Sequence, residues 1–249
     1  IIVPVTILEI PPIKIFSIRF YKKNKVVGEV VNENLDKELK RIVKIPKKKG
    51  KKIEDIKDYD DVRVLVYSET KKTGMKKTPD MAEIGLGGSL DEKIAFAKEN
   101  LSKEITIDKF AEKNALIDIR GLTKGHGLSG PVKRFGIKLR QHKSEKGRRR
   151  PGSLGPWHPA HTTFRAPMAG QLGLFSRLQY NYKIINLGKI TEKNINPKQG
   201  WKNFGNIKTE YIILQGSVPG PSKRQLLLTS PLRATKKQEK KKYEFMRLV

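Results

Sequence analysis

Residues 121–170 restrict the possible folds of this chain more than any other part, because they contain no pattern from which a packed domain could be built. Hydrophobic residues follow neither the period of two of a strand nor the period of 3.6 of a helix, and glycines and prolines interrupt every short apolar run. The dense cations of this segment face a single acid, Glu145. These cations are Arg134, Lys138, Arg140, Lys143, Lys146, Arg148, Arg149 and Arg150.

Mutual repulsion and a shortage of aliphatic side chains should keep this segment unfolded in water. Ordering a backbone costs about 1 to 2 kcal/mol per residue, and the segment has little apolar surface to offset that cost. A structureless insertion of this length is uncommon unless it has a function. We therefore expect residues 121–170 to form a long, basic, non-globular extension that needs a negatively charged partner.

The whole chain supports a polyanionic partner. It carries 53 Lys and Arg against 25 Asp and Glu, a formal net charge of +28. Cysteine is absent, which excludes disulfides and thiolate metal sites. No apolar run reaches the length that spans a bilayer, so we expect no membrane partner.

The flanking segments have the alternation and β-branched residues of a mostly β body. One helix is expected at residues 89–102, SLDEKIAFAKENLS, where Ser89 and Glu92 fit a capping box and Leu90, Ile94, Phe96 and Ala97 supply an apolar face. Strands are expected at VTILEI, FSIRFY, residues 61–68, NALIDIRG, YKIINLGKI, KTEYIILQGSV and RQLLLTSPL. The expected organisation is a first half of the body at 1–120, the extension at 121–170, a second half at 171–235 and a basic C-terminal tail at 236–249.

Gly125, Gly127 and Gly130 spell GxGxxG, the spacing of a dinucleotide-binding loop. That function requires the glycines to open a helix and an acid to follow about 20 residues later. Gly136 interrupts the following residues, and the later position falls among arginines. A mobile solvated loop remains one alternative. The favoured interpretation is close backbone approach, in which these glycines bring Lys124, His126, Lys133 and Arg134 against a phosphodiester backbone.

Trp157 lies between Pro156 and Pro159 without apolar neighbours in sequence. A structural role is the usual one for tryptophan, but the cationic context favours stacking on bases. His158 and His161 do not predict a metal site, because no acid cluster accompanies them. Ser129 lacks the residues of a nucleophile elbow, so we expect neither an enzyme nor a cofactor or small-molecule substrate. Arg148, Arg149 and Arg150 could be a solvated loop or a localisation signal, although their context favours phosphate.

Several motifs follow one another along the chain: VTILEIPP, KKTPDMAEIGLGGSLDEKIAFAKENL, NALIDIRG, GLTKGHGLSGPVKRFGIK, GSLGPWHPAH, RAPMAGQLG and GSVPGPSKR. Taken together and in this order, they resemble the family of large ribosomal subunit protein three in its archaeal and eukaryotic form. The resemblance implies a closed β-barrel body of translation-factor type with a helical insertion. It also implies that a basic N-terminal arm precedes Ile1. Glu145 stands where eukaryotic members have a histidine, so any role of that histidine is in doubt here.

The resemblance further implies a structural constituent of the large subunit in the cytoplasmic ribosome. Such a protein binds near the 3′ end of the large rRNA, helps to nucleate subunit assembly and extends toward the peptidyl transferase centre. Its expected neighbours are ribosomal protein fourteen and the archaeal protein twenty-four-e. The residues expected to bind rRNA are Lys124, His126, Lys133, Arg134, Lys138, Arg140, Lys143, Lys146, Arg148, Arg149, Arg150, Trp157, His158, His161, Lys223 and Arg224. A DNA-compacting basic protein is the main alternative from charge alone.

Overall fold

The computed structural model describes residues 1–249 except 47–49, 51, 144–146 and 249. The chain divides into two compact units. Unit 1 comprises Ile1–Ile117, Asn181–Ser217 and Pro231–Val249, and unit 2 comprises Asp118–Tyr180 and Val218–Ser230. Unit 2 therefore contains the whole of residues 121–170 and the two further candidate residues Lys223 and Arg224. No helix among the described residues is both long enough and apolar enough to cross a membrane.

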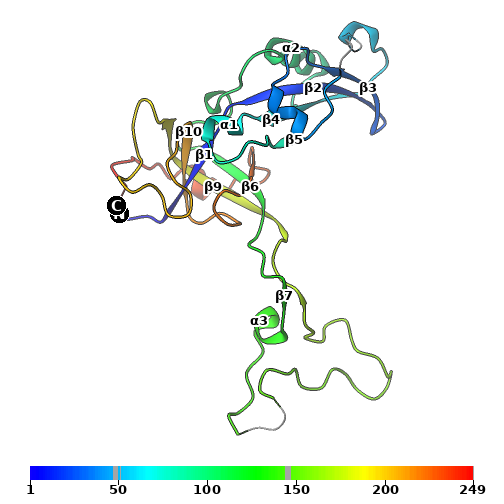
Figure 1. Ribbon diagram of the computed structural model, residues 1–249, viewed down its shortest axis with the longest axis vertical. Helices are drawn as coiled ribbons and strands as arrows, with labels where there is room; N and C mark the ends of the chain where they lie inside the picture. Colours follow the sequence, from blue (N-terminus) through cyan, green and yellow to red (C-terminus); the bar gives the residue numbers. More distant parts are fainter. Residues whose placement is uncertain (47–49, 51, 144–146, 249) are drawn as a thin grey trace. The chain divides into compact units, whose positions relative to one another are not determined.

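The first sheet of unit 1 is antiparallel and has the order β3-β2-β4-β5 (Figure 1). Its strands are β2 (Ile13–Lys22), β3 (Lys25–Val31), β4 (Asp61–Ser68) and β5 (Met81–Gly85). The apolar side chains of β4 alternate as expected for a strand with two faces: Val62, Val64 and Val66 join one core, whereas Tyr67 packs with Phe16 on the other side. The strand predicted at residues 61–68 is confirmed as β4 with the same bounds, whereas no strand was predicted at β3 or β5.

Helix α2 (Leu90–Asn100) covers the core face of this sheet. The predicted capping box is confirmed, because the Ser89 hydroxyl accepts a hydrogen bond from Glu92 N and Ser89 N donates to Glu92 Oε2. The predicted apolar face is only partly buried. Ala97 and Ile94 pack against the sheet, but Leu90 and Phe96 each remain 37% exposed.

The second sheet contributes β1, β10, β9 and β6, in that order, to unit 1. These strands are β1 (Val5–Ile10), β6 (Leu116–Leu122), β9 (Ser176–Lys189) and β10 (Glu210–Gln215). β6 and β9 continue into unit 2, where β11 (Leu227–Thr229) pairs antiparallel with β6. Tyr211 and Ile213 lie in the apolar cluster on this sheet, together with the partly buried Trp201.

The remaining elements are short. They are α1 (Thr70–Thr73), α3 (Pro131–Phe135), α4 (Lys236–Glu239), η1 (Lys37–Arg41), η2 (Ile53–Asp55), η3 (Ile107–Lys109), β7 (Leu128–Ser129) and β8 (Gly170–Gln171).

The expected mostly β architecture with few helices is confirmed, but the expected closed barrel is not. Among the described residues both large sheets are open, ending at β3 and β5 in the first and at β1 and β11 in the second. Pro11 and Pro12 separate β1 from β2, and proline has no N–H with which to continue a ladder. The chain leaves one sheet and enters the other at this point, and the part of the chain that the structure describes forms no continuous closed sheet.

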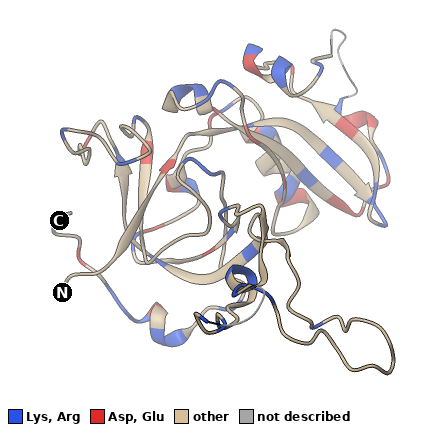
Figure 2. Cartoon of the chain, turned by 60° about the horizontal axis from the view of Figure 1, so that its bottom comes forward, with Lys and Arg blue, Asp and Glu red and all other residues tan. Residues whose placement is uncertain are grey.

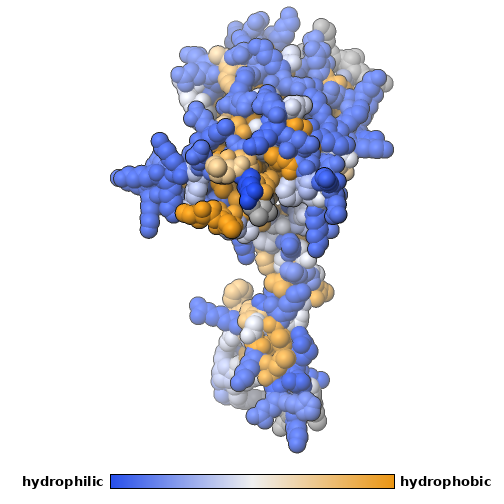
Figure 3. All heavy atoms as spheres, turned by 90° about the vertical axis from the view of Figure 1, so that its left-hand side faces the viewer, coloured by the Kyte–Doolittle hydropathy of each residue, from blue (hydrophilic) through white to orange (hydrophobic). Residues whose placement is uncertain are grey.

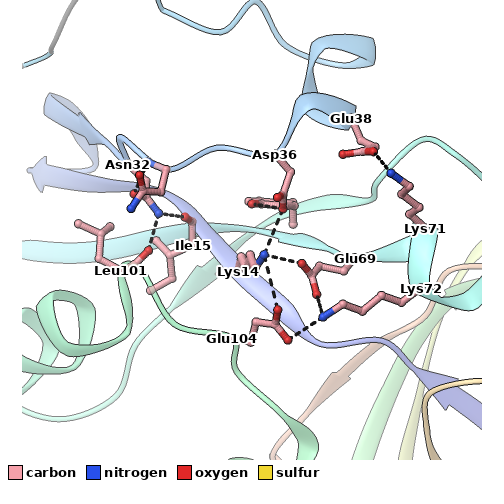
Figure 4. Close-up of polar contacts among 12 residues, drawn as sticks. Lys14, Ile15, Asn32, Asp36, Glu38, Glu69, Lys71, Lys72, Leu101 and Glu104 are labelled. Carbon is pink, nitrogen blue, oxygen red and sulfur yellow. Dashed lines mark hydrogen bonds and ion pairs between the residues drawn. The ribbon is translucent and has the colours of Figure 1, made fainter.

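A cluster of ionised side chains joins β2 to α1 and to the chain after α2 (Figure 4). Lys14 Nζ lies 2.5 Å from Glu69 Oε1, 3.4 Å from Asp36 Oδ2 and 3.6 Å from Glu104 Oε1. Burial disfavours the ammonium ion, but the hydrogen bond to Glu69 and the other carboxylates outweigh it and raise the pKa of Lys14. Lys72 Nζ forms an ion pair with Glu104 Oε2 at 2.7 Å. The cluster therefore connects the segments that carry Asp36, Glu69 and Glu104 within unit 1.

The C-terminal segment packs against the rest of unit 1. Tyr243, Phe245 and Leu248 contact the apolar cluster of the second sheet. The buried Lys183 donates from Nζ to the carbonyl of Glu239 at 3.2 Å, and burial lowers the pKa of this lysine. The basic C-terminal tail thus contains apolar residues that hold it on the body.

Candidate nucleic-acid interface

Unit 2 contains two segments, 123–129 and 170–175, that run antiparallel; we call this pair the stem. Leu128 pairs with Gln171 and Ser129 with Gly170 in the β7–β8 ladder. The ladder is extended by hydrogen bonds from His126 N to Leu172 O and from Leu172 N to Gly127 O, each 2.9 Å. The sequence predicted no regular structure in residues 121–170, so this pairing is a finding of the structure.

Close backbone approach occurs in the stem, between the two segments of the chain itself. Gly173 has φ +81°, and a Cβ at this residue would lie 2.0 Å from Lys124 O and 2.9 Å from Gly125 Cα. Both conditions require glycine at this position. Gly127 also has positive φ, whereas Gly130 is the N-cap of α3 with open space around it. Of the three glycines in GxGxxG, Gly125 is thus the one at the close approach.

Helix α3 follows Gly130 and has only five residues, ending at Gly136 with φ 71°. Pro131 occupies its first turn, where a missing N–H costs no hydrogen bond. The guanidinium of Arg134 donates from Nε to Gln171 O at 3.1 Å and from Nη1 to Met168 O at 2.9 Å. Arg134 therefore connects α3 to the returning segment of the stem. Lys133, its neighbour on the same helix, is exposed.

Residues 137–167, which we call the tip, contain no helix or strand in their described part (Figure 1). Arg140 and Arg148 close a loop, because Arg140 N donates to Arg148 O at 3.2 Å and Arg148 Nε donates to Arg140 O at 3.3 Å. Arg140 Nη2 also donates to Pro151 O. Lys138, Lys143, Arg149 and Arg150 are exposed. Glu145 and the candidate residue Lys146 lie outside the described residues.

Trp157 is 85% exposed, and Phe164 is fully exposed. His158 and His161 are exposed as well, and His161 Nδ1 lies 3.1 Å from Pro159 O. No group of three or more metal-ligating side chains exists among the described residues. The exposure of Trp157 removes the alternative of a core tryptophan. Trp201, by contrast, packs against the apolar cluster of the second sheet in unit 1.

Lys223 and Arg224 lie on the second segment of unit 2, where both are exposed. Gly220 precedes them with φ +99°, and a Cβ there would lie 2.7 Å from Leu122 O. Pro221 O accepts a hydrogen bond from Arg224 N at 3.3 Å, which forms a turn. This turn fixes the two cations next to the end of β6.

Few side chains of unit 2 are buried beyond Asp118 and Ile119 in β6. Between residues 120 and 180, only Ser129 and Gly173 are buried among the described positions. Figure 3 shows apolar residues at the surface beside hydrophilic ones. Exposed aromatic and aliphatic side chains in that range include Leu128, Phe135, Trp157, Phe164, Met168 and Leu174. Exposed apolar side chains in a segment without a core of its own mark a candidate interaction surface.

The excess positive charge lies mainly in the second part of the chain. Residues 113–249 contain 29 Lys and Arg against 6 Asp and Glu, whereas residues 12–112 contain 24 against 18. The described loops of residues 121–170 carry Lys and Arg but no Asp or Glu (Figure 2). Unit 2 itself carries 15 Lys and Arg against two acids, Asp118 and Glu145, together with exposed aromatic rings, which is the composition of a surface for nucleic acid.

Comparison with known proteins agrees with these observations. The profile of the family described as Ribosomal protein L3 matches residues 1–247. The chain is 41% identical over 244 residues to "Large ribosomal subunit protein uL3" of Methanocaldococcus jannaschii, which covers 92% of this chain and 72% of the relative.

Two further archaeal relatives carry the same name. The protein of Picrophilus torridus is 41% identical over 245 residues, covering 95% of this chain and 74% of the relative. That of Archaeoglobus fulgidus is 38% identical over 249 residues, covering 95% and 75%. With a family match along nearly its whole length and relatives at this identity, the chain belongs to the ribosomal protein L3 family.

Proposed function

We propose that this chain is a structural, RNA-binding constituent of the large subunit of the cytoplasmic ribosome, and that residues 121–170 are its main rRNA-binding part. Membership of a ribosomal protein family supports the first statement and the expectation that the chain is not an enzyme. One observation carries the second: residues 120–180 bury almost none of their described side chains while presenting cations and aromatic rings.

Two kinds of contact explain how such a segment binds folded RNA. Exposed Lys and Arg side chains displace counterions from phosphates, which supplies affinity without reading sequence. Exposed aromatic rings stack on unpaired bases, and each stack contributes about 1 to 3 kcal/mol. In this proposal Trp157 stacks at the tip. Lys138, Lys143, Arg149 and Arg150 neutralise phosphates around it, while the stem supplies Lys124 and helix α3 supplies Lys133.

The stem and the tip differ in how many interactions of their own they have to offset the entropy cost of ordering. The stem has its own ladder of backbone hydrogen bonds, whereas the tip has few hydrogen bonds and no buried side chain among its described residues. We propose that the stem is ordered in the free protein and that the tip is ordered by rRNA, because only contact with RNA can offset the entropy of fixing it.

The finer location in the subunit rests on the family resemblance. We propose that the protein binds near the 3′ end of the large rRNA, that the tip extends toward the peptidyl transferase centre, and that binding helps to nucleate subunit assembly. On the same basis, its protein neighbours are ribosomal protein fourteen and the archaeal protein twenty-four-e. Lys223 and Arg224 add a second contact with rRNA from the turn after Gly220.

Sedimentation tests the assignment directly. The tagged protein, expressed in an archaeal host, should sediment with large subunits at moderate salt and leave them when the rRNA is degraded. A competition assay then separates the proposal from a DNA-compacting function. A transcript of the 3′-terminal domain of the large rRNA should displace labelled rRNA at much lower concentration than duplex DNA of equal length. Equal competition by duplex DNA, with no protein in the large-subunit peak, would overturn the proposal.

A further inference from the structure

Arg134 was expected to bind rRNA, but the structure shows that its side chain is already engaged. Its Nε donates to Gln171 O and its Nη1 to Met168 O, so two of its donors hold backbone carbonyls of the returning segment. Its Cζ also lies 5.1 Å from the centre of the Phe135 ring. Arginine suits this arrangement because its planar fork presents several donors in fixed directions.

Gly170 provides independent evidence for the same contact. A Cβ at Gly170 would lie 2.9 Å from Arg134 Nη1 and 3.0 Å from Arg134 Cζ. The guanidinium therefore occupies the space that a side chain at residue 170 would need. Gly170 also pairs with Ser129 in the β7–β8 ladder, so the arginine contacts the strand at the point where the stem is formed.

We infer that Arg134 is a positioning residue, which fixes α3 on the stem and so orients the phosphate-binding cations, above all Lys133. This inference rests on the proposed function, since it assigns Arg134 a role in rRNA binding that acts through its neighbours. Lys133 has no hydrogen bond or ion pair among the described residues, whereas Arg134 donates two hydrogen bonds to backbone carbonyls of the chain. Two adjacent cations of one helix thus have different roles.

Three variants of the full chain, together with Arg134→Ala, separate these roles. Arg134→Lys keeps the charge but loses the planar fork. Gly170→Ala keeps every charge and displaces the guanidinium, whose flexible side chain can move without straining the backbone. Lys133→Ala removes one exposed charge from the same helix and leaves the two hydrogen bonds of the Arg134 guanidinium intact. Two measurements are made on each variant: amide hydrogen exchange of residues 123–136 and 168–173 in the free protein, and the salt dependence of binding to a transcript of the 3′-terminal rRNA domain.

We expect Arg134→Lys and Gly170→Ala to accelerate amide exchange in the stem and α3, and to weaken binding about fivefold, as for the loss of one hydrogen bond, with an unchanged salt slope. Lys133→Ala should leave exchange unchanged and reduce the slope by about 0.7 to 0.9. Wild-type exchange in the Arg134→Lys and Gly170→Ala proteins would overturn the inference. So would an Arg134→Ala protein that loses salt slope as Lys133→Ala does while its exchange stays unchanged.

The two readouts also distinguish this inference from the proposed function. Amide exchange is measured without RNA, so it tests the contact between Arg134 and the stem even if no variant binds the transcript. Absence of binding by the wild-type protein would count against the proposed function alone. Exchange of the β4 amides in unit 1 serves as the control that each variant is folded.

Discussion

Replacing Arg149 and Arg150 by alanine should flatten the salt dependence of rRNA binding by a predictable amount. Seven Lys and Arg side chains of residues 121–170 make no hydrogen bond or ion pair among the described residues: Lys124, Lys133, Lys138, Lys143, Arg149, Arg150 and Arg165. If each neutralises one phosphate, the logarithm of the binding constant falls with the logarithm of salt concentration with a slope of about −5 to −6. Affinity then drops about 10³- to 10⁴-fold between 50 and 200 mM salt.

The double variant removes two of these seven contacts, so its slope should be less steep by about 1.4 to 1.8. Filter binding to the 3′-terminal rRNA transcript at five or more salt concentrations measures this change. The matched control is Lys37→Ala with Lys98→Ala, which removes the same charge from exposed positions of η1 and α2, in the part of the chain with nearly balanced charge. An unchanged slope in the Arg149/Arg150 variant, or an equal change in the control, would refute the reasoning.

Gly173→Ala should open the stem, because its Cβ would lie 2.0 Å from Lys124 O at a positive φ; amide exchange of residues 123–129 should accelerate, and acceleration by the control Gly130→Ala, which has open space, would contradict this account. Ser89→Ala should lower the free energy of unfolding by about 1 kcal/mol through loss of the helix cap, measured by denaturant titration, and an unchanged midpoint would contradict it. The hydrogen bond from Lys93 holds the pKa of Asp61 below its ordinary value, so its stabilisation is present at neutral pH and is lost as pH falls below about 4. Asp61→Asn should therefore make the fall of melting temperature in acid shallower than in the wild type, and parallel curves would show that the pair has no such role.

Local patterns in the sequence predict the local parts of the fold. The alternation of Val62, Val64 and Val66 is sufficient to place β4, and Ser89 with Glu92 is sufficient to place the start of α2. Strand β3 has a glycine and a glutamate inside a short apolar run, which weakens its pattern. Whether the sheets close depends on pairing between distant strands, for which single-segment patterns carry no information.

In the candidate interface, too, the sequence predicts local features but not contacts between distant segments. The cations and Trp157 can be chosen from sequence because their density and isolation are visible there, although their contacts with rRNA stay a prediction. The stem cannot be chosen in this way, since it depends on the approach of Gly173 to Lys124, about 50 residues apart in the chain. The engagement of Arg134 is also invisible in sequence, because its partners are backbone carbonyls, which every residue possesses.

Photo-crosslinking from the tip tests the central claim most directly. A benzophenone amino acid in place of Trp157 would be incorporated into the full chain, and assembled large subunits would be purified and irradiated. The account predicts adducts with the large rRNA, while the same probe in place of Phe96 on α2 gives far fewer. Adducts from residue 157 that contain only protein, or none in subunits that hold the protein at full occupancy, would contradict the claim that rRNA surrounds the tip.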